Sequence, residues 1–582
     1  MALNPQSFSV PYHLGALVEA LLEEWRSGDV LSRLWGRDAS LWTGADEARW
    51  LGWLEGPGST EPGRYEAIAG ELRAGHFSDV LLLGMGGSVL CPLVFAQVFG
   101  RRPSSPKLHV LDSVDPVQIR NVERAIDPSR MLVIVSSKSG STLESRILME
   151  YFLQRVRQEV GSGRCGERFI AITDPGSPLE TSARELGFRR VCPGRPDIGG
   201  RFSAFSDFGL LPLATMGVDV GRFLGDTMPM VEACGPHADV LGSPGALLGA
   251  VLGILCRAGR DKATFVVSPS IQDLGLWIEQ LLAESTGKSG LGLIPVTGEK
   301  LRSPGRYDDD RLFVYIRFIP GTDGAQEEGL AKLEASGQPV VRIDIGDPYR
   351  IGQELFRWEI ATALAGSHLG INPFDQPDVE ASKQATRQLM SGYAAQGAFP
   401  PERPAYADDG LRVFAAGEMG ERLGDSGRWE PGLAGCMQAF LGSVQKGDYC
   451  AILAYAPMDE ATTDALERLR DTLGERAKTA ATLGFGPRYL HSVGQIHKGG
   501  PNSGVFLVLV SEDTEDLAVP GHAYTFGVVK AAQARADAEV LTARNRRVIR
   551  IDIAGGFVSG VGRITAALRQ AGGRPPQKNF TA

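Results

Sequence analysis

The chain has no stretch of about 18 consecutive apolar residues, the length that a membrane-spanning helix needs. Its first residues, MALNPQSFSVPYHLG, also lack the basic start and apolar run of a secretory signal peptide. Both absences argue against a membrane protein or an exported one. We therefore expect a soluble protein of the cytoplasm.

Cysteine is scarce, with 7 residues in 582, and the cysteines show neither zinc-site spacing nor a disulfide framework. Reduced thiols are the simplest interpretation. A basic excess is also missing, since the formal net charge is -9, which argues against a broad nucleic-acid surface. A local pocket of Lys and Arg can still hold an anion, so the expected partner is a small molecule.

Length and composition indicate a globular protein of several domains. A chain of 582 residues is too long for one hydrophobic core, and the usual domain size of roughly 100–200 residues suggests three or four units. The hydrophobic content of 43% and charged content of 22% are ordinary for folded proteins. The 73 glycines fit an α/β fold, where glycine occupies tight turns between strands and helices.

Short apolar runs alternate with amphipathic stretches from residue 79 onward, as expected of buried parallel strands with helical crossovers. Examples are VLLLG and MLVIVSS, then ATFVVSPS and PVVRIDIG, then YCAILAYAP and RRVIRIDIAG. The pattern predicts an α/β protein of parallel sheets flanked by helices. The predicted units are a helical arm (1–72), two α/β domains (73–240 and 241–397) and, after a Pro-rich linker, a C-terminal α/β lobe (411–582).

Two polar turns follow strands of the first series. In GMGGSVL, Gly87 and Ser88 can direct backbone N–H groups toward an anion at a helix N-terminus. A tight turn without a ligand is the alternative. The third glycine of a dinucleotide fingerprint is missing, which argues against a dehydrogenase.

The second turn, SSKSGST at the start of SSKSGSTLES, places five hydroxyl side chains and one lysine directly after a strand. Buried sheet faces do not supply partners for so many hydroxyls, whereas a phosphate at a helix N-terminus does. Helix capping alone is the alternative interpretation. The candidate phosphate ligands in this turn are Ser137, Lys138, Ser139, Ser141 and Thr142.

Three further residues have side chains suited to acid–base and electrostatic work. Arg201, in DIGGRFSAF, follows a Gly-Gly turn and can meet developing negative charge, although a surface arginine is the alternative. Gln280 and Glu284, in WIEQLLAESTGK, are four residues apart and project from one face of a helix. A lone glutamate usually lies solvated at the protein surface, but the apolar neighbours of Glu284 make that placement less favoured.

Two later clusters complete the set. FDQPDVEASK holds Gln376 and Lys383, and LHSVGQIHKGG holds His491 and His497. Only 8 histidines occur in the chain, so two within seven residues are unusual. Neither an acid nor a cysteine stands beside them at metal-ligand spacing, which argues against zinc. A structural role for His497 remains open.

As an ordered set, GMGGS, SSKSGST, GGRFS, QLLAESTGK and FDQPDVEASK resemble the glucose-6-phosphate isomerase family. With WLGWLEG and LHSVGQIHKGGPNSG, the chain looks most like the isomerase part of bifunctional transaldolase/glucose-6-phosphate isomerases. The resemblance implies two sugar-isomerase (SIS) domains of flavodoxin-like type and an extra C-terminal lobe. It also implies no cofactor. A homodimer and a functional link to a transaldolase are partner hypotheses.

The resemblance further implies residue roles. Glu284 would be the base that moves a proton between C1 and C2, Arg201 would stabilise the enediolate, and Lys383 would act at the ring oxygen. The family's ring-opening histidine lies between the Glu and Lys motifs, where this chain has only His368, so we assign that role to His491, with His368 and His497 as alternatives. The implied substrate ligands are Gly87, Ser88, Ser137, Lys138, Ser139, Thr142, Gln280 and Gln376.

The expected reaction is therefore the interconversion of glucose 6-phosphate and fructose 6-phosphate through a cis-enediol. One competing hypothesis is a non-catalytic regulator that binds a sugar phosphate, which would need the Ser/Thr turn only. Another is an isomerase of a different sugar phosphate. The joint presence of Glu284, Arg201 and Lys383 favours an enzyme.

Overall fold

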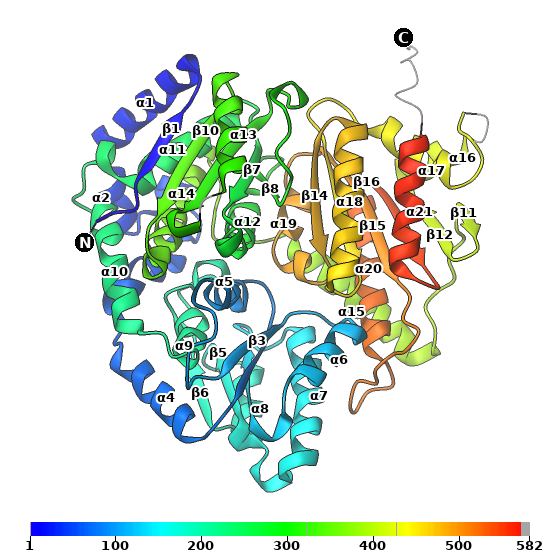
Figure 1. Cartoon of the computed structure of the whole chain (residues 1–582), viewed down its shortest axis with the longest axis horizontal. Coiled ribbons are helices and arrows are strands. Elements are labelled where there is room, and N and C mark those ends of the chain that lie inside the picture. Colours follow the sequence, from blue (N-terminus) through cyan, green and yellow to red (C-terminus); the bar gives the residue numbers. More distant parts are fainter. Residues whose placement is uncertain (1, 322, 426–427, 572–582) are drawn as a thin grey trace.

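The computed structural model describes residues 2–321, 323–425 and 428–571, and it arranges them around three β-sheets (Figure 1). The first sheet is parallel throughout, in the order β3 (Lys107–Leu111), β2 (Asp79–Gly84), β4 (Met131–Ser136), β5 (Phe169–Thr173) and β6 (Arg190–Pro193). The second has the order β1 (Gln6–Ser9), β10 (Val340–Ile345), β9 (Arg311–Phe318), β7 (Lys262–Val267) and β8 (Ile294–Thr297). The predicted α/β fold is confirmed.

The third sheet lies in the C-terminal lobe and is mixed. Its order is β11 (Tyr406–Asp408), β12 (Leu411–Ala415), β16 (Arg547–Ile553), β15 (Gly504–Ser511), β13 (Tyr449–Tyr455) and β14 (Ala480–Phe485). The strands β11 and β12 at one edge pair in antiparallel fashion, and the pairs from β16 to β14 are parallel.

Helices cover both faces of the sheets. Those up to residue 257 are α1 (Tyr12–Ser27), α2 (Val30–Trp35), α3 (Gly56–Ser59), α4 (Gly63–Ala74), α5 (Leu90–Phe99), α6 (Pro116–Ala125), α7 (Leu143–Val160), α8 (Pro178–Glu185), α9 (Asp207–Thr215), α10 (Val220–Ala233) and α11 (Pro244–Arg257). The later ones are α12 (Asp273–Thr286), α13 (Gly324–Ala335), α14 (Ile351–Leu369), α15 (Val379–Gln396), α16 (Gly417–Gly424), α17 (Leu433–Ser443), α18 (Glu460–Ala477), α19 (Gly494–Gly499), α20 (Phe526–Ala543) and α21 (Phe557–Gln570).

The apolar runs became strands because both of their faces are buried. In β2, Leu82 packs into one core and its neighbour Leu81 into the core on the opposite face. Strands in this situation need apolar side chains at every position rather than at every second one. The core that contains Leu82 continues through Leu312 of β9 to Leu14 of α1, so the first two sheets share it.

Two elements lie where the sequence analysis did not anticipate them. The N-terminal segment, expected as a helical arm, also supplies β1, which pairs antiparallel with β10 at the edge of the second sheet. Helix α15, expected in the second domain, packs against α20 of the lobe. Both placements depend on tertiary contacts between segments far apart in the chain, which local patterns do not encode.

The lobe contacts both neighbours through apolar and polar groups. Against the second sheet, Tyr449 and Ile496 share an apolar cluster with Ala283 and Ile294, and Arg470 of the lobe donates a hydrogen bond to the Thr297 carbonyl. Against the first sheet, Phe526 of the lobe packs on Tyr151 within a shared apolar cluster. Four polar contacts stand beside it, in which the acid comes from the first unit and the base from the lobe. These are Asp112–Arg488 at 2.6 Å, Asp115–Lys530 at 2.7 Å, Glu144–His491 at 2.9 Å and Glu150–His522 at 3.1 Å.

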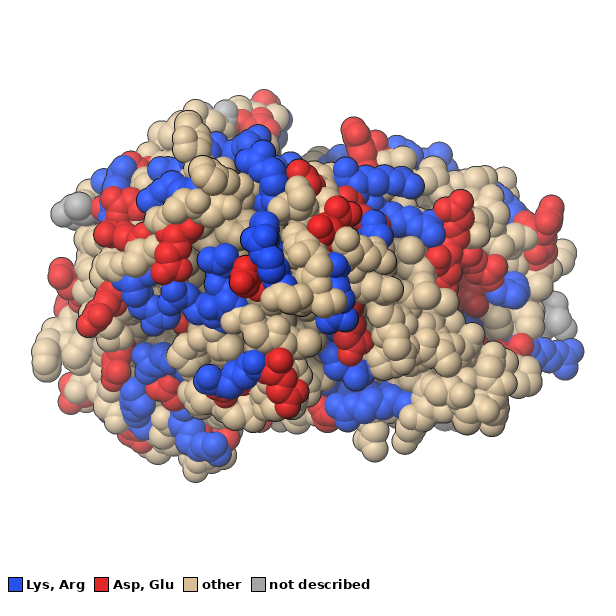
Figure 2. Space-filling view, turned by 90° about the horizontal axis from the view of Figure 1, so that it is seen from below, with Lys and Arg blue, Asp and Glu red and all other residues tan. Residues whose placement is uncertain are grey.

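Two features concern binding to membranes and to nucleic acids: the apolarity of the helices and the charges on the outer surface. Among the described residues, no helix combines the length and apolarity needed to cross a bilayer. On the face drawn in Figure 2, acidic and basic side chains are interspersed. That mixture gives this face no single-sign field of the kind that attracts nucleic acid.

The buried ion pair at Lys530 predicts a measurable loss of stability. The Lys530 side chain is 1% exposed and lies between Asp115 and Asp513, so Lys530→Met would leave two buried carboxylates without their cation. We expect the free energy of unfolding to fall by about 3–5 kcal/mol. Urea unfolding followed by tryptophan fluorescence measures the change.

Lys332→Met is the matched control, because its partner Glu328 and Lys332 itself are both exposed. That variant should change stability by less than about 1 kcal/mol. Equal unfolding midpoints for the two variants would contradict a stabilising role for the lobe's polar contact.

Candidate active site

The two polar turns of the sequence lie next to each other at the carboxyl ends of the neighbouring strands β2 and β4. From β2 the chain passes to β3 on one side, and β4 lies on the other, so the loops after β2 and β4 diverge and leave a crevice between them. Ligands of open α/β sheets usually bind in such a crevice. It is formed here by the turn at Gly86–Ser88 and by the Ser/Thr turn, residues 137–142.

Gly87 makes room for the segment that carries Arg201. A Cβ atom at this position would lie 2.2 Å from the carbonyl carbon of Gly200, so only glycine permits the two backbones to approach this closely. Gly86 next to it has a φ of +54°, in the left-handed region. Ser88 is buried at the same turn.

The Ser/Thr turn directs hydroxyl groups toward the first turn of α7. Ser137 is buried and donates a hydrogen bond to Thr142, and the hydroxyls of Ser139 and Ser141 lie 3.0 Å apart. Thr142 is the N-cap residue of the 18-residue α7, but its side chain makes no capping hydrogen bond. Hydroxyls beside the unpaired N–H groups of a helix N-terminus form a suitable anion site.

Lys138 differs from its neighbours in the turn. Its ammonium lies 2.5 Å from the Asp174 carboxylate and donates a second hydrogen bond to the Arg195 carbonyl. The structure therefore does not bring this lysine to the hydroxyl groups with which we predicted it to act. The charge of Lys138 is balanced by Asp174, which follows the adjacent strand β5, a contact that the local sequence does not reveal.

Arg201 lies in the 3₁₀ turn Gly200–Phe202 and is 2% exposed. Its guanidinium donates to the Ser285 hydroxyl at 2.7 Å and to the Gln376 side chain at 2.9 Å. Its Nη2 group donates to the backbone carbonyls of Pro373 and Asp375. Arg201 is thus a buried cation held by two other segments, and the surface alternative does not apply.

Glu284 lies 3.6 Å from Arg201, and its side chain is 12% exposed. Gln280, one helical turn earlier in α12, donates a hydrogen bond to Glu284 at 3.0 Å and another to the backbone carbonyl of His491 at 2.8 Å. A built Cβ on Gly86 would come within 2.9 Å of the same Gln280 amide. The carboxylate is therefore half of a buried ion pair at the edge of the crevice.

His491 reaches this region from the C-terminal lobe. Its Nε2 atom lies 2.9 Å from Glu144 in the first turn of α7, and Gln533 of α20 donates to the same carboxylate oxygen at 2.6 Å. Burial favours a raised pKa for Glu144, but the His491 and Gln533 contacts outweigh it and lower the pKa below its usual value. Glu144 is thus a buried carboxylate that orients an imidazole.

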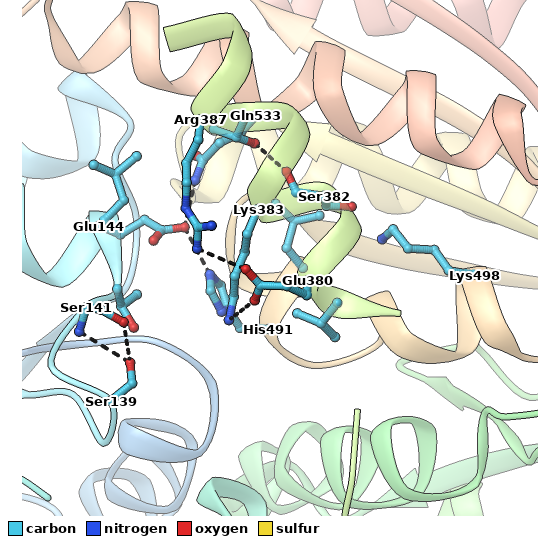
Figure 3. A pocket seen from close by; sticks show the side chains of 15 residues that line it. Ser139, Ser141, Glu144, Glu380, Ser382, Lys383, Arg387, His491, Lys498 and Gln533 are labelled. Atoms are coloured by element: carbon cyan, nitrogen blue, oxygen red, sulfur yellow. Dashed lines mark hydrogen bonds and ion pairs between the residues drawn. The ribbon is translucent and has the colours of Figure 1, made fainter. Parts of the chain in front are cut away.

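A cavity of about 110 Å³ lies next to His491 and Glu144 (Figure 3). Its polar wall comes from the Ser/Thr turn, from α15 and from the lobe. It includes Ser139, Ser141, Thr142, Glu144, Glu380, Ser382, Lys383, Arg387, His491, Lys498 and Gln533. The Lys383 side chain is 45% exposed, with Glu380 at 3.6 Å. Glu284 and Arg201 are not among the lining residues, and Gln280 links Glu284 to the cavity wall by its hydrogen bond to the His491 carbonyl.

The other two histidines considered for ring opening are placed elsewhere. His368 lies in the last turn of α14 and packs beside Gly253 of α11. His497 is buried in the lobe against Tyr449 and Phe506, and burial lowers its pKa to about 3. Among the three, His491 lines the cavity.

Two charged residues near the site were missed by the sequence analysis. Glu144 stands two positions after Thr142, where a helix's first turn favours an acid, but its inward direction could not be foreseen. Lys288 follows Glu284 in the ESTGK segment and is buried 3.1 Å from Asp375. Within the described ranges, no group of three or more His, Cys, Asp or Glu residues is arranged to hold a metal.

The comparisons with known proteins agree with this geometry. The family model described as phosphoglucose isomerase matches residues 65–290. The probable glucose-6-phosphate isomerase of Natronomonas pharaonis is 32% identical, over 60% of this chain and 86% of its own length. The glucose-6-phosphate isomerase of Thermus thermophilus is 30% identical, over 59% of this chain and 90% of its own length.

Two solved structures have a fold similar to that of this chain. A hypothetical protein from Thermus thermophilus aligns with a TM-score of 0.54 and 27% identity, over 66% of this chain and all of that one. A glucose-6-phosphate isomerase from Chlamydia trachomatis has the same fold, with a TM-score of 0.50 and 23% identity, over 63% of this chain and 78% of that one.

Fold and site together define an α/β protein of the sugar-phosphate isomerase class, with a hydroxyl-rich turn at a helix N-terminus and a carboxylate–arginine pair. The relatives are specific enough to go one step further. The chain belongs to the glucose-6-phosphate isomerase family.

Proposed function

We propose that this enzyme interconverts glucose 6-phosphate and fructose 6-phosphate through a cis-enediol. The observation that carries the proposal is the pairing of Glu284 with the buried Arg201 at 3.6 Å, at the edge of the crevice that holds the Ser/Thr turn. An anion site alone would suit a regulator. A carboxylate and a fixed cation beside that site are what proton transfer at a carbon next to a carbonyl requires.

The substrate phosphate binds at the N-terminus of α7 in this proposal. Ser137, Ser139 and Thr142 supply hydroxyl donors, and the turn at Gly87 and Ser88 closes the other side of the crevice. Lys138 is paired with Asp174. In this proposal it lies beside the phosphate-binding turn but makes no direct bond to the phosphate. Holding the distant phosphate positions C1 and C2 without adding groups at the reacting carbons.

Proton transfer is the task of Glu284. The carboxylate removes the proton from one of the two carbons and returns it to the other, while Arg201 stabilises the negative charge on oxygen in between. Gln280 fixes one carboxylate oxygen, and Gln376 fixes the guanidinium. The site needs no reorganisation at the moment when charge develops.

Ring opening is the task of Lys383 and His491, which reach into the same cavity. The histidine exchanges the proton of the anomeric hydroxyl, and the lysine donates to the ring oxygen. Glu144 holds the imidazole by one nitrogen and leaves the other for the substrate. This division separates the ring chemistry from the carbon chemistry at Glu284.

Three wider attributes complete the proposal. The likeness to the isomerase part of bifunctional transaldolase/glucose-6-phosphate isomerases is supported by the histidine in the lobe, and a functional link to a transaldolase rests on that likeness. A homodimer rests on the family resemblance alone. A cytoplasmic location is supported by the seven cysteines, all of which are free and buried.

Glu284→Gln tests the base directly. The amide keeps the shape and the contact with Gln280 but cannot accept a proton, so we expect kcat to fall by about 10²–10⁴-fold. Sugar-phosphate affinity, measured by calorimetry, should stay within about threefold of the wild-type value. Glu328→Gln, on the exposed face of α13, is the control with unchanged kcat. Near-normal turnover of Glu284→Gln with fructose 6-phosphate in a coupled assay would refute the proposal.

Glu144→Gln tests ring opening separately. Opening and reclosing the ring interconverts the α and β anomers of glucose 6-phosphate, and NMR line shapes report that exchange. We expect Glu144→Gln to slow anomer exchange by about 10²-fold or more, because His491 loses the carboxylate that orients it. Glu284→Gln should retain fast anomer exchange while it fails to isomerise. Loss of exchange in both variants, or in neither, would contradict the division of labour.

A further inference from the structure

Lys288 is a buried cation next to the reacting groups. It follows the end of α12, four residues after Glu284, and its side chain is 6% exposed. The ammonium donates hydrogen bonds to the backbone carbonyl of Ser285 at 2.9 Å and to that of Asn372 at 2.6 Å. The Asp375 carboxylate lies 3.1 Å away. A lysine in this setting is held by three groups and has little freedom.

The segments that hold Lys288 are the same ones that hold Arg201. Ser285 accepts from Lys288 through its carbonyl and from Arg201 through its hydroxyl. The 372–376 segment accepts from Lys288 at Asn372 and from Arg201 at Pro373 and Asp375. Lys288 thus ties the end of the Glu284 helix to the loop that receives the guanidinium.

The local charge balance also involves this lysine. Two buried cations, Arg201 and Lys288, lie beside two carboxylates, Glu284 and the partly exposed Asp375. Burial and the nearby Arg201 charge lower the pKa of Lys288 to about 7, although Asp375 opposes the effect. Burying a second cation is costly, which points to a role in the reaction for the contacts that it makes.

We propose that Lys288 is a positioning residue for the isomerisation, which holds Arg201 and Glu284 at the spacing that the enediolate requires. This inference rests on the function proposed above. Its effect acts through Arg201 and the α12 terminus, so it should appear in the transition state and not in the binding of the substrate phosphate.

Lys288→Met keeps the length of the side chain and removes its charge and three donors. We expect kcat to fall by about 10²-fold, as for a misplacement of reacting groups by about 1 Å, with KM within about threefold of wild type. Affinity for a sugar-phosphate hydroxamate, a planar mimic of the enediolate, should fall in parallel with kcat. A purely structural tie would leave both quantities unchanged in the folded variant. Lys332→Met is the exposed control.

Asp375→Asn provides a second variant if Lys288→Met does not fold, because the Asp375 side chain is 44% exposed. It removes the acid partner of Lys288 and should lower kcat several-fold at unchanged KM, whereas full activity would overturn the proposal. Isomerase activity of the wild-type protein tests the proposed function separately from the positioning role of Lys288. An inactive wild type would overturn both, and an active wild type with an equally active Lys288→Met would overturn the positioning role alone.

Discussion

The rest of the site depends on the hydrogen bonds that the buried guanidinium of Arg201 donates. Burying a cation is costly unless its donors find acceptors, and Arg201 finds them on the end of α12 and on the 372–376 loop. The planar fork of arginine can satisfy several acceptors at once in a fixed geometry, which lysine cannot. The helix that carries Glu284, the turn at Gly87 and the loop of Gln376 are therefore held in one relative position.

Gly87 imposes a second constraint on the position of the Arg201 segment. Because a side chain there would collide with the Gly200 backbone, the Arg201 turn can lie directly against the end of β2. The turn after β2 and the segment that carries Arg201 are consequently held next to each other. Their separation is set by backbone contacts, which are stiffer than side-chain contacts.

Much of the fold could be predicted, because strands buried on both faces must be apolar throughout and MLVIVSS satisfies that condition. The pairing of Gln280 with Glu284 could be predicted from helical spacing alone. The pairing of Lys138 with Asp174 could not, because it depends on which strand lies next to β4. The inward direction of Glu144 was hidden for a similar reason, since its partners stand almost 350 and 390 positions later in the chain.

The acid–base contact between Glu144 and His491 joins the first unit and the lobe of a single polypeptide. Every group to which proton transfer and ring opening are assigned comes from that one polypeptide. Dilution cannot separate the histidine from its carboxylate, because a covalent tether keeps their effective concentration high at any protein concentration. Under the proposed assignments, catalysis is in this respect independent of self-association, so the surface of the molecule can vary without changing the reacting groups.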